Sequence, residues 1–221
     1  PEHITDFMYK ILDVNKDDYV LDATCGSGGF LVKAMANMIR EAGGMQSDTA
    51  AEIKSSHLYG IEFDREIYAL ACANMLIHKD GKTNLEQMDA RTESACEWMK
   101  SKPITKVLMN PPYENKYGCM TIVENVLDNV PAHTQCAFIL PDKKLEKASK
   151  AQIKRILKNH RLRKVIKLPE DLFFGIGITT SIFVFEAGVG QDGKEFFACY
   201  MESDGLATVK NKGRHDIYGK W

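Results

Sequence analysis

Four polar side chains stand where apolar runs of the sequence end. Asp22, Glu62, Asp89 and Asn110 each close or directly follow such a run. In an open parallel sheet the carboxyl ends of the strands meet at one edge, so we expect these side chains to lie together there. Three acids and an amide favour a ligand with hydroxyls, amino groups or a positive charge, and they disfavour phosphates. The runs are YVLDATC (19–25), HLYGIEF (57–63), TNLEQMDA (83–90) and KVLM (106–109).

A glycine-rich stretch, DATCGSGGF (22–30), closes the first of these runs. Gly26, Gly28 and Gly29 let the backbone turn sharply and come close to a ligand. Such a loop alone could serve NAD, a flavin, a phosphate or only a tight turn. The spacing lacks the third glycine of GxGxxG, which a dinucleotide needs beside its pyrophosphate. The loop therefore disfavours a dinucleotide.

The other strand ends predict parts of an adenosine. Glu62 stands where an acid can accept hydrogen bonds from two ribose hydroxyls, and Phe63 could lie against an adenine ring. Asp89 could accept from the adenine amino group; the alternative for either acid is an ordinary surface charge. S-adenosylmethionine has no phosphate but carries a sulfonium cation and an amino group, which Asp22 suits electrostatically. We therefore expect S-adenosylmethionine as the cofactor.

The fourth run ends in an unusual way, in LMNPPYENK (108–116). An amide, two prolines and an aromatic ring follow one another directly after an apolar strand. An ordinary turn needs neither the second proline nor the ring. The alternative is a simple proline turn, which the glycine-rich loop earlier in the chain disfavours. The stretch is therefore a candidate site.

Strands and helices alternate along the chain, which predicts a doubly wound open α/β sheet. Further strands are expected at 134–142, 162–170 and 180–188, with a possible extra edge strand at 195–201. Helices are expected at 30–43, 64–81, 121–129 and 144–160. We expect residues 44–56 to be a polar connection or insertion, and residues 209–221 to be a loop or linker.

Together with other stretches, these motifs resemble the catalytic domain of N6-adenine DNA methyltransferases, and more specifically the modification subunit of type I restriction-modification systems. The resemblance runs from Pro1 to about Ala187. It implies an α/β, Rossmann-like S-adenosylmethionine-dependent methyltransferase fold, an open and mostly parallel seven-stranded sheet with its last strand antiparallel. The stretches are PEHITDFMYKIL (1–12), DATCGSGGFL (22–31), GIEFD (60–64), NMLIH (74–78), MDA (88–90), NPPY (110–113), FILPD (138–142) and VIKLPEDLFFGIGITTSIFVFE (165–186).

The resemblance implies roles in cofactor binding. The glycine-rich loop would line the methionine part of the cofactor with Asp22 below it, while Glu62 would hold the ribose and Asp89 the adenine. In the family, the opening motif usually has a threonine before its proline and touches the cofactor, whereas this chain begins at Pro1. The implied cofactor-binding residues are Asp22, Thr24, Gly26, Ser27, Gly28, Gly29, Glu62, Phe63, Asp89 and Ala90.

Asn110, Pro111, Pro112 and Tyr113 form the implied catalytic motif. In amino-methyltransferases the target nitrogen is a poor nucleophile because its lone pair is delocalised. The Asn110 side-chain oxygen and the Pro111 carbonyl would accept its N–H hydrogens and localise the lone pair toward the methyl group, and the prolines would hold that carbonyl rigidly. Tyr113 would stack on the extruded adenine, and a phenylalanine of LFFGIG (172–177) would cover the other face.

The composition excludes several other classes. The 221 residues are 44% hydrophobic and 27% charged, with no secretory signal and no apolar run long enough for a membrane span. The six cysteines form no CxxC pair, so we expect no metal site and no zinc deaminase. Scattered cysteines suit a reducing cytosol and predict a cytoplasmic protein, and the resemblance to restriction-modification enzymes implies a bacterium or archaeon.

A basic stretch stands out from a chain whose net charge is only −1. Residues 143–167 contain 8 Lys and 3 Arg against one Glu. One interpretation is a solvated helix face, and the other is a surface that faces DNA phosphates.

The order of the motifs predicts partners. Only 24 residues (114–137) separate NPPY from the core of the fifth strand, so no target-reading domain is inserted there. In the type I family a separate specificity subunit reads the DNA sequence. The resemblance therefore implies double-stranded DNA with a flipped adenine and a specificity subunit as partners, with a restriction subunit as a further candidate. We expect a catalytic domain at 1–188 and an extra edge strand and linker at 189–221, as a piece cut from a longer protein.

Three alternatives stay open. Methyltransferases that act on a glutamine of release factors, or on an RNA amino group, also carry NPPY, because their target nitrogens are delocalised too. A dinucleotide-dependent oxidoreductase is disfavoured by the missing third glycine and by NPPY. A non-catalytic DNA-binding or assembly subunit is disfavoured by the intact motif.

Overall fold

The computed structural model describes residues 2–78, 84–114, 118–142, 148–170, 172, 178–209, 213–216 and 219. Its main sheet has the strands β1 (Val20–Asp22), β2 (Leu58–Glu62), β3 (Asn84–Gln87), β4 (Lys106–Met109), β5 (Gln135–Pro141), β6 (Arg161–Lys167), β7 (Thr180–Glu186) and β8 (Phe197–Tyr200). The described helices are α1 (Glu2–Ile11), α2 (Gly29–Glu41), α3 (Asp48–Ser56), α4 (Arg65–Ile77), α5 (Glu93–Lys100), α6 (Cys119–Asn129) and α8 (Lys150–Asn159).

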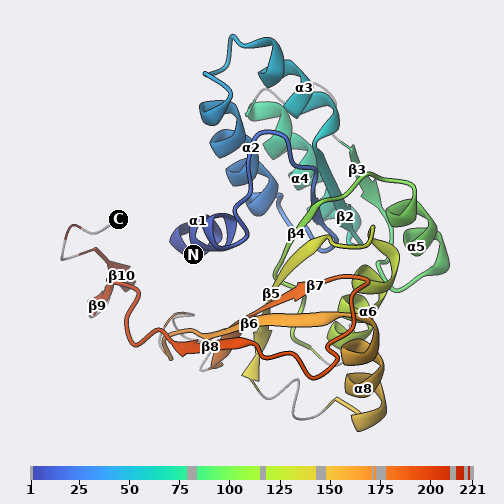
Figure 1. Cartoon of the computed structure of the whole chain (residues 1–221). Coiled ribbons are helices and arrows are strands. Elements are labelled where there is room, and N and C mark those ends of the chain that lie inside the picture. The colour runs from blue at the N-terminus through green and yellow to red at the C-terminus, as the bar shows by residue number, and fades with distance from the viewer. Residues whose placement is uncertain are drawn as a thin grey trace.

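The eight strands lie in the order β3-β2-β1-β4-β5-β7-β6-β8 (Figure 1). Neighbouring strands are parallel, except that β7 runs antiparallel to both β5 and β6. The predicted methyltransferase sheet with a reversed seventh strand is confirmed, and the extra edge strand is β8. The chain builds outward from β1 to β3 and then returns to β4 beside β1. The switch point therefore lies between β1 and β4, where open α/β sheets bind ligands.

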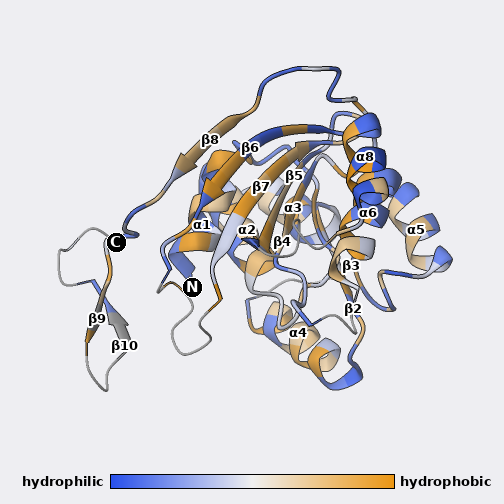
Figure 2. Ribbon diagram, turned by 90° about the horizontal axis from the view of Figure 1, so that it is seen from below, coloured by the Kyte–Doolittle hydropathy of each residue, from blue (hydrophilic) through white to orange (hydrophobic). Residues whose placement is uncertain are grey.

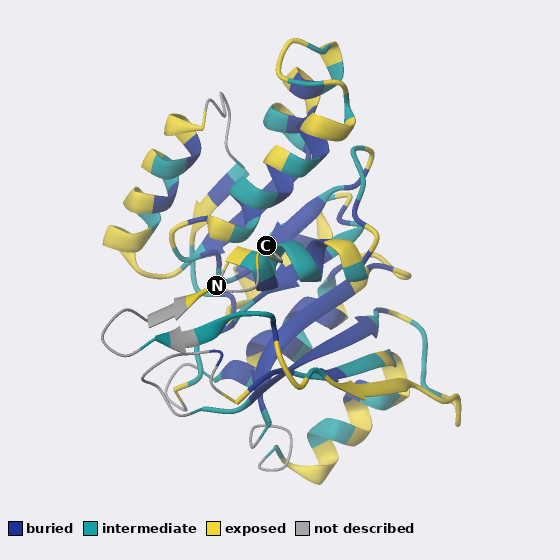
Figure 3. Cartoon of the chain, turned by 90° about the vertical axis from the view of Figure 1, so that its left-hand side faces the viewer, coloured by how far each residue is buried: buried dark blue, intermediate teal, exposed yellow. Residues whose placement is uncertain are grey.

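Both faces of the sheet are buried because successive side chains of the central strands enter opposite cores. In β4, Leu108 packs with α1 to α4, whereas Val107 and Met109 pack with α5, α6 and α8. All three side chains are inaccessible to solvent. The central strands are accordingly dark blue in Figure 3, with exposed positions on the outer faces of the helices.

One expected connection is in fact a helix. Residues 44–56 were expected to be a polar connection or insertion, but α3 occupies Asp48–Ser56. The Ser47 side chain accepts a hydrogen bond from the Ala50 N–H at 3.1 Å, which caps the helix. Of the α3 residues, Ala50 and Ile53 are buried. Two apolar positions are too few to show the helical period of 3.6 residues in the sequence.

Three further segments depart from the sequence analysis. The first is α1 (Glu2–Ile11), a helix in a stretch where no element was predicted. Helix α5 (Glu93–Lys100), capped by the Thr92 side chain, lies in a stretch with no predicted element. The tail at 209–221 was expected to be a loop or linker, yet β10 (Gly213–His215) pairs antiparallel with β9 (Ala207–Val209) in a separate two-stranded sheet. This short ladder carries little apolar periodicity, so the sequence pattern does not reveal it.

The first helix is joined to the segment that follows β8. His3 Nε2 lies 2.9 Å from Asp204 Oδ2, and the Asp204 side chain is fully buried. Ile4 and Met8 of the same helix are buried in the core beside α2. Residues near the two ends of the chain therefore pack on the same domain.

Candidate functional site

A cavity of about 350 Å³ opens where β1 to β4 end. It lies at the switch point of the sheet, the position expected for a ligand site in this architecture. Residues that follow four different strands meet there. The lining residues are Ala23, Thr24, Gly26, Glu62, Phe63, Asp64, Ile67, Met88, Asp89, Ala90, Arg91, Pro112 and Ile122.

The glycine-rich loop forms one wall of the cavity. The Cys25 N–H donates to the carbonyl of Ile61 at 2.9 Å, which ties the loop to β2. Gly26 (φ +55°) and Gly28 (φ +84°) adopt left-handed conformations that favour glycine. Gly28 is also the N-cap of α2, so the loop passes directly into that helix. The loop can adopt this conformation because glycine tolerates the positive φ angles at positions 26 and 28.

Glu62 is held in place by the backbone on both sides. Its Oε2 accepts from the Gly26 N–H at 3.0 Å, and its Oε1 accepts from the Asp64 N–H at 2.8 Å. Each carboxylate oxygen keeps a further lone pair for a ligand hydroxyl. Both bonds come from main-chain groups of ordered turns. The carboxylate is therefore oriented before any ligand binds.

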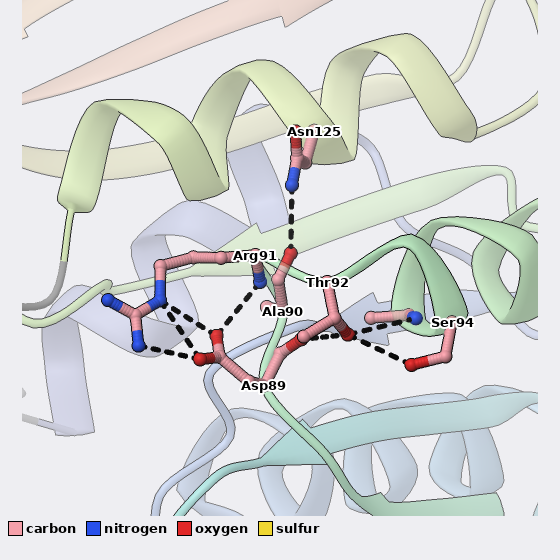
Figure 4. A network of polar contacts seen from close by, with 7 residues as sticks. Asp89, Ala90, Arg91, Thr92, Ser94 and Asn125 are labelled. Carbon is pink, nitrogen blue, oxygen red and sulfur yellow. Dashed lines mark hydrogen bonds and ion pairs between the residues drawn. The ribbon is translucent and has the colours of Figure 1, made fainter.

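Asp89 is held differently, by the side chain of Arg91 (Figure 4). Arg91 Nε donates to Asp89 Oδ1 at 2.9 Å, and Arg91 Nη2 donates to Oδ2 at 2.6 Å. This bidentate contact lowers the pKa of Asp89, and backbone donation from the Arg91 N–H acts in the same direction. The carboxylate that the sequence assigns to the adenine thus already has a cationic partner.

The strand end that carries Asp89 is braced by a hydrogen bond from α6. Asn125 Nδ2 donates to the Ala90 carbonyl at 3.2 Å, as Figure 4 shows above the Asp89 carboxylate. The Thr92 hydroxyl donates to the Asp89 carbonyl at 2.7 Å and begins α5. The backbone around Asp89 is therefore fixed, whereas its side chain is held only by Arg91.

Asp22 lies beneath the loop, in the core. Its side chain is 1% exposed, and burial raises the pKa of Asp22 to about 7, with the charge of Glu62 adding to the effect. The Thr24 N–H donates to Asp22 Oδ1 at 3.0 Å and opposes that shift. A cation bound above Asp22 would favour its ionised form.

The NPPY motif follows β4 directly. Pro111 is buried, Pro112 lines the cavity, and Tyr113 packs against the core on the α1 side. The Tyr113 hydroxyl donates to the Asn110 side-chain oxygen at 2.5 Å. Burial raises the pKa of the Tyr113 hydroxyl well above its usual value, so it stays protonated and remains a donor. In this arrangement the Asn110 oxygen already has a partner.

The predicted residues divide into two groups. Of the cofactor set, Thr24, Gly26, Glu62, Phe63, Asp89 and Ala90 line the cavity. Asp22, Ser27, Gly28 and Gly29 do not; they lie below it or on the turn into α2. Of the catalytic set, only Pro112 lines it. Residues 173 and 174, considered as a second aromatic cover, lie outside the described residues.

Several residues that line the cavity were not predicted from the sequence. Ala23, Asp64, Ile67, Met88, Arg91 and Ile122 complete the cavity. The signal for Arg91 was present: an arginine two residues after an aspartate at a strand end can fold back onto its carboxylate. Ile67 and Ile122 belong to helices, and their spacing alone does not separate a pocket wall from the core.

The residues present fit an adenosine that carries a positive charge. The Thr24 side chain lines the cavity and interacts with the Asp22 carboxylate, whose charged form it favours. Phe63 is 58% exposed beside Glu62, which leaves a ring face for a flat base. Glu62 and Asp22 supply negative charge. The described part of the chain contains no group of three His, Cys, Asp or Glu side chains that could hold a metal ion.

The basic stretch 143–167 is described only from residue 148 onward. Arg155 contacts Glu124 at 2.9 Å, and Arg163 contacts Glu186 at 3.1 Å. Arg163 also lies near the start of β6. The cavity lies at the other end of the sheet, where β1 to β4 have their carboxyl ends. These two arginines are therefore structural. Exposed lysines at four-residue spacing form one stripe on α8: Lys150, Lys154 and Lys158.

Comparison with known families gives a match to the N-6 DNA methylase model at residues 1–135 and 123–212. The type II restriction enzyme and methyltransferase RM.BcgI of Heyndrickxia coagulans is 34% identical, over 96% of this chain and 35% of its own. The type I restriction enzyme EcoEI methylase subunit of Escherichia coli is 23% identical, over 85% of this chain and 42% of its own. The chain thus spans less than half the length of these relatives.

Solved structures share the fold. The type I restriction enzyme EcoKI M protein superposes with a TM-score of 0.76 at 18% identity, covering 86% of this chain and 44% of its own. At this identity the likeness supports the fold alone. Among the described residues, none of the helices is both long and apolar enough to cross a membrane.

Proposed function

Because the chain belongs to the N-6 DNA methylase family, we propose that it is the catalytic part of an S-adenosylmethionine-dependent DNA methyltransferase. Its target is N6 of an adenine, and it acts within a restriction-modification system. One observation carries this proposal: the cavity that Glu62 and Asp89 line is also lined by Pro112 of NPPY. A site suited to adenosine therefore adjoins a motif suited to a planar amine.

The cofactor half of the site binds through oriented acceptors. Glu62 would accept from the ribose hydroxyls, since its carboxylate is already fixed by the Gly26 and Asp64 N–H groups. Asp89 would accept from the adenine amino group, and Thr24 would line the cofactor pocket. When bound, S-adenosylmethionine supplies an activated methyl group on a sulfonium. The carboxylate of Asp22 would favour that positive charge from below.

The target half prepares the nitrogen for attack. Asn110 Oδ1 and the Pro111 carbonyl would accept the two N–H hydrogens of the target amine, which keeps its lone pair from delocalising into the ring. Pro111 is buried, so its carbonyl is held in a defined position. The adenine must leave the duplex to reach these groups, at a cost of a few kcal/mol. The Tyr113 hydroxyl occupies one lone pair of Asn110 Oδ1, and the second lone pair would accept from the base.

The partners follow from the family and the charge distribution. Double-stranded DNA is the substrate, and the exposed lysines of α8 are candidate contacts to its phosphates. A separate specificity subunit reads the sequence, and a restriction subunit completes the system. We place the catalytic domain at 1–188 and the protein in the cytoplasm of a bacterium or archaeon.

Methylation of unmethylated DNA tests the proposal directly. The protein, with its specificity partner, is incubated with S-adenosylmethionine, and the digested DNA is weighed as nucleosides by mass spectrometry. We expect N6-methyladenine, and a loss of about 100- to 1000-fold for Asn110→Ala because an oriented acceptor is removed. The matched control is Asn129→Ala, whose side chain bonds only within α6.

Two results would contradict the proposal. Unchanged methylation by Asn110→Ala would remove the assigned mechanism. Cofactor binding without any methylated base would redirect the activity to a protein glutamine or an RNA amino group, the acceptors that the same motif can serve.

A further inference from the structure

Among the described residues, the outer edge of the sheet is formed by β8 (Phe197–Tyr200), which pairs with β6 alone. The Met201 N–H donates to the Lys167 carbonyl at 2.8 Å, so the odd-numbered residues of this strand turn their backbone toward β6. Backbone direction alternates along a strand. The N–H and C=O groups of Phe196, Ala198 and Tyr200 therefore point outward.

The same strand is unusually apolar for an exposed edge. Phe196, Phe197 and Tyr200 are each about half exposed, at 49%, 58% and 51%. Figure 2 shows β8 at the margin of the sheet, coloured mostly as hydrophobic. Edge strands are normally protected by a charge, a proline or a bulge, and none occurs between Phe196 and Met201. Such an edge is suited to receive another strand.

An antiparallel second copy of the segment around Ala198 would place residues of complementary chemistry opposite one another. Two residues away on either side stand the aromatic rings of Phe196 and Tyr200, and four residues away, just beyond the two ends of β8, stand the opposite charges of Lys194 and Glu202. Two antiparallel copies that cross at Ala198 would therefore place an aromatic ring opposite an aromatic ring and a cation opposite an anion. Both kinds of cross-strand pair are stabilising.

We propose that β8 is a homodimer interface, in which it pairs antiparallel with β8 of a second copy of this chain about a two-fold axis at Ala198. Phe196 faces the partner's Tyr200, and Lys194 faces the partner's Glu202. The outward backbone groups of Ala198 then form a hydrogen-bonded pair with those of the partner's Ala198.

Other registers fit less well. An axis at Tyr200 would bring the partner's Asp204 opposite Phe196, but Asp204 is buried beside His3 and is not available at the edge. An axis at Cys199 would set Phe196 opposite the partner's Glu202 and Lys194 opposite the partner's Asp204, which is buried beside His3. Only the axis at Ala198 satisfies the charges and the rings together.

Charge exchange tests the interface in solution. The molar mass of the 221-residue chain is measured against concentration by analytical ultracentrifugation. We expect a monomer–dimer equilibrium that Lys194→Glu and Glu202→Lys each weaken about tenfold, because each change sets like charges opposite each other twice. A mixture of the two variants, and the double variant, should both restore the wild-type equilibrium. A structural role of either residue within one copy would not produce this rescue.

Cross-linking tests the register. Residues in a hydrogen-bonded antiparallel pair have Cα atoms about 5.5 Å apart, within the range of a disulfide. Ala198→Cys in a Cys199→Ser background should form a disulfide-linked dimer on oxidation. Ser203→Cys in the same background, exposed but five residues from the axis, should not. A monomer at every concentration, or equal cross-linking by both cysteines, would overturn the proposal and leave this edge to a different chain.

Discussion

The two halves of the candidate site are held by different kinds of hydrogen bond. In the cofactor half, Glu62 is fixed by the backbone N–H groups of Gly26 and Asp64. In the target half, Asn110 is held by the side chain of Tyr113. Backbone donors in ordered turns cannot rotate away, whereas a side-chain donor can exchange for a ligand. The Glu62 carboxylate is therefore fixed before a ligand binds, whereas the contact between Tyr113 and Asn110 can exchange.

Asp89 does not fit this division into a cofactor half with backbone donors and a target half with a side-chain donor. Its carboxylate is held by both the side chain and the backbone N–H of Arg91, whereas the Asn110 amide is held by the side chain of Tyr113. The side-chain contacts thus lie where we propose that the base edges of cofactor and substrate bind. The contact made by backbone groups alone lies where we propose that the ribose binds.

The largest effect on cofactor affinity should come from removing the fixed acceptor. Glu62→Ala loses an oriented carboxylate for two hydroxyls, and we expect affinity for S-adenosylmethionine to fall about 10- to 100-fold in calorimetric titration. Glu66→Ala, an exposed position on α4, is the matched control. Equal affinities for both variants would break the distinction between a fixed and an exchangeable half.

The next effect is a pH dependence that originates at Asp22. Its folded pKa of about 7 lies above the ordinary value of 3.8, so its ionisation costs stability as pH rises between those values. Relative to Asp22→Asn, the free energy of unfolding of the wild type should fall by roughly 4 kcal/mol over that range. Denaturant unfolding of both proteins at several pH values measures the difference.

Cofactor affinity should change with pH in the opposite direction. Ionised Asp22 attracts the sulfonium, so affinity should rise about tenfold from pH 6 to pH 8 in the wild type. Asp22→Asn should show a flat profile. A wild-type affinity that is equally flat would mean that Asp22 does not sense the ligand charge.

A smaller effect is expected at the exchangeable carboxylate. Arg91→Ala removes the side-chain contacts to Asp89 and keeps the bond from the backbone N–H, and we expect cofactor affinity to rise about threefold, because a partly exposed ion pair contributes little. Arg65→Ala, at the exposed start of α4, is the control. A fall in affinity would instead assign Arg91 to the cofactor as a direct contact.

The smallest effect is expected from the Tyr113 hydroxyl. Tyr113→Phe keeps the ring for stacking and removes the bond to Asn110, so the rate of methyl transfer should stay within about threefold of wild type. Tyr113→Ala, which removes the ring as well, should lose considerably more. If Phe and Ala were equally impaired, the hydroxyl itself would be needed during the reaction.

The sequence predicts positions in this molecule better than it predicts contacts. Apolar runs ending in Glu62, Asp89 and Asn110 predicted one shared edge, because strand period and parallel topology determine where strand ends meet. Nothing in that pattern reports rotamers, so the bonds of Arg91 to Asp89 and of Tyr113 to Asn110 were not foreseen.

Local helices show a similar limit. Helix α3 was missed because it buries only Ala50 and Ile53, and α5 because it buries only Ala95 and Met99. In both, a hydroxyl cap begins a short helix whose polar surface hides the period of 3.6 residues. By contrast, α6 buries five residues and is visible in the sequence.

The contact between His3 and Asp204 joins positions 201 residues apart in the chain. Because a contact of such separation closes a very long loop, it forms only when nearly everything between is already ordered. It therefore reports on the folded domain as a whole. The docking of α1 through its own residues Ile4 and Met8 and the ordering of the segment after β8 should accordingly form and break as one cooperative step. A protease that cuts near position 204 would then also destabilise the packing of the first helix.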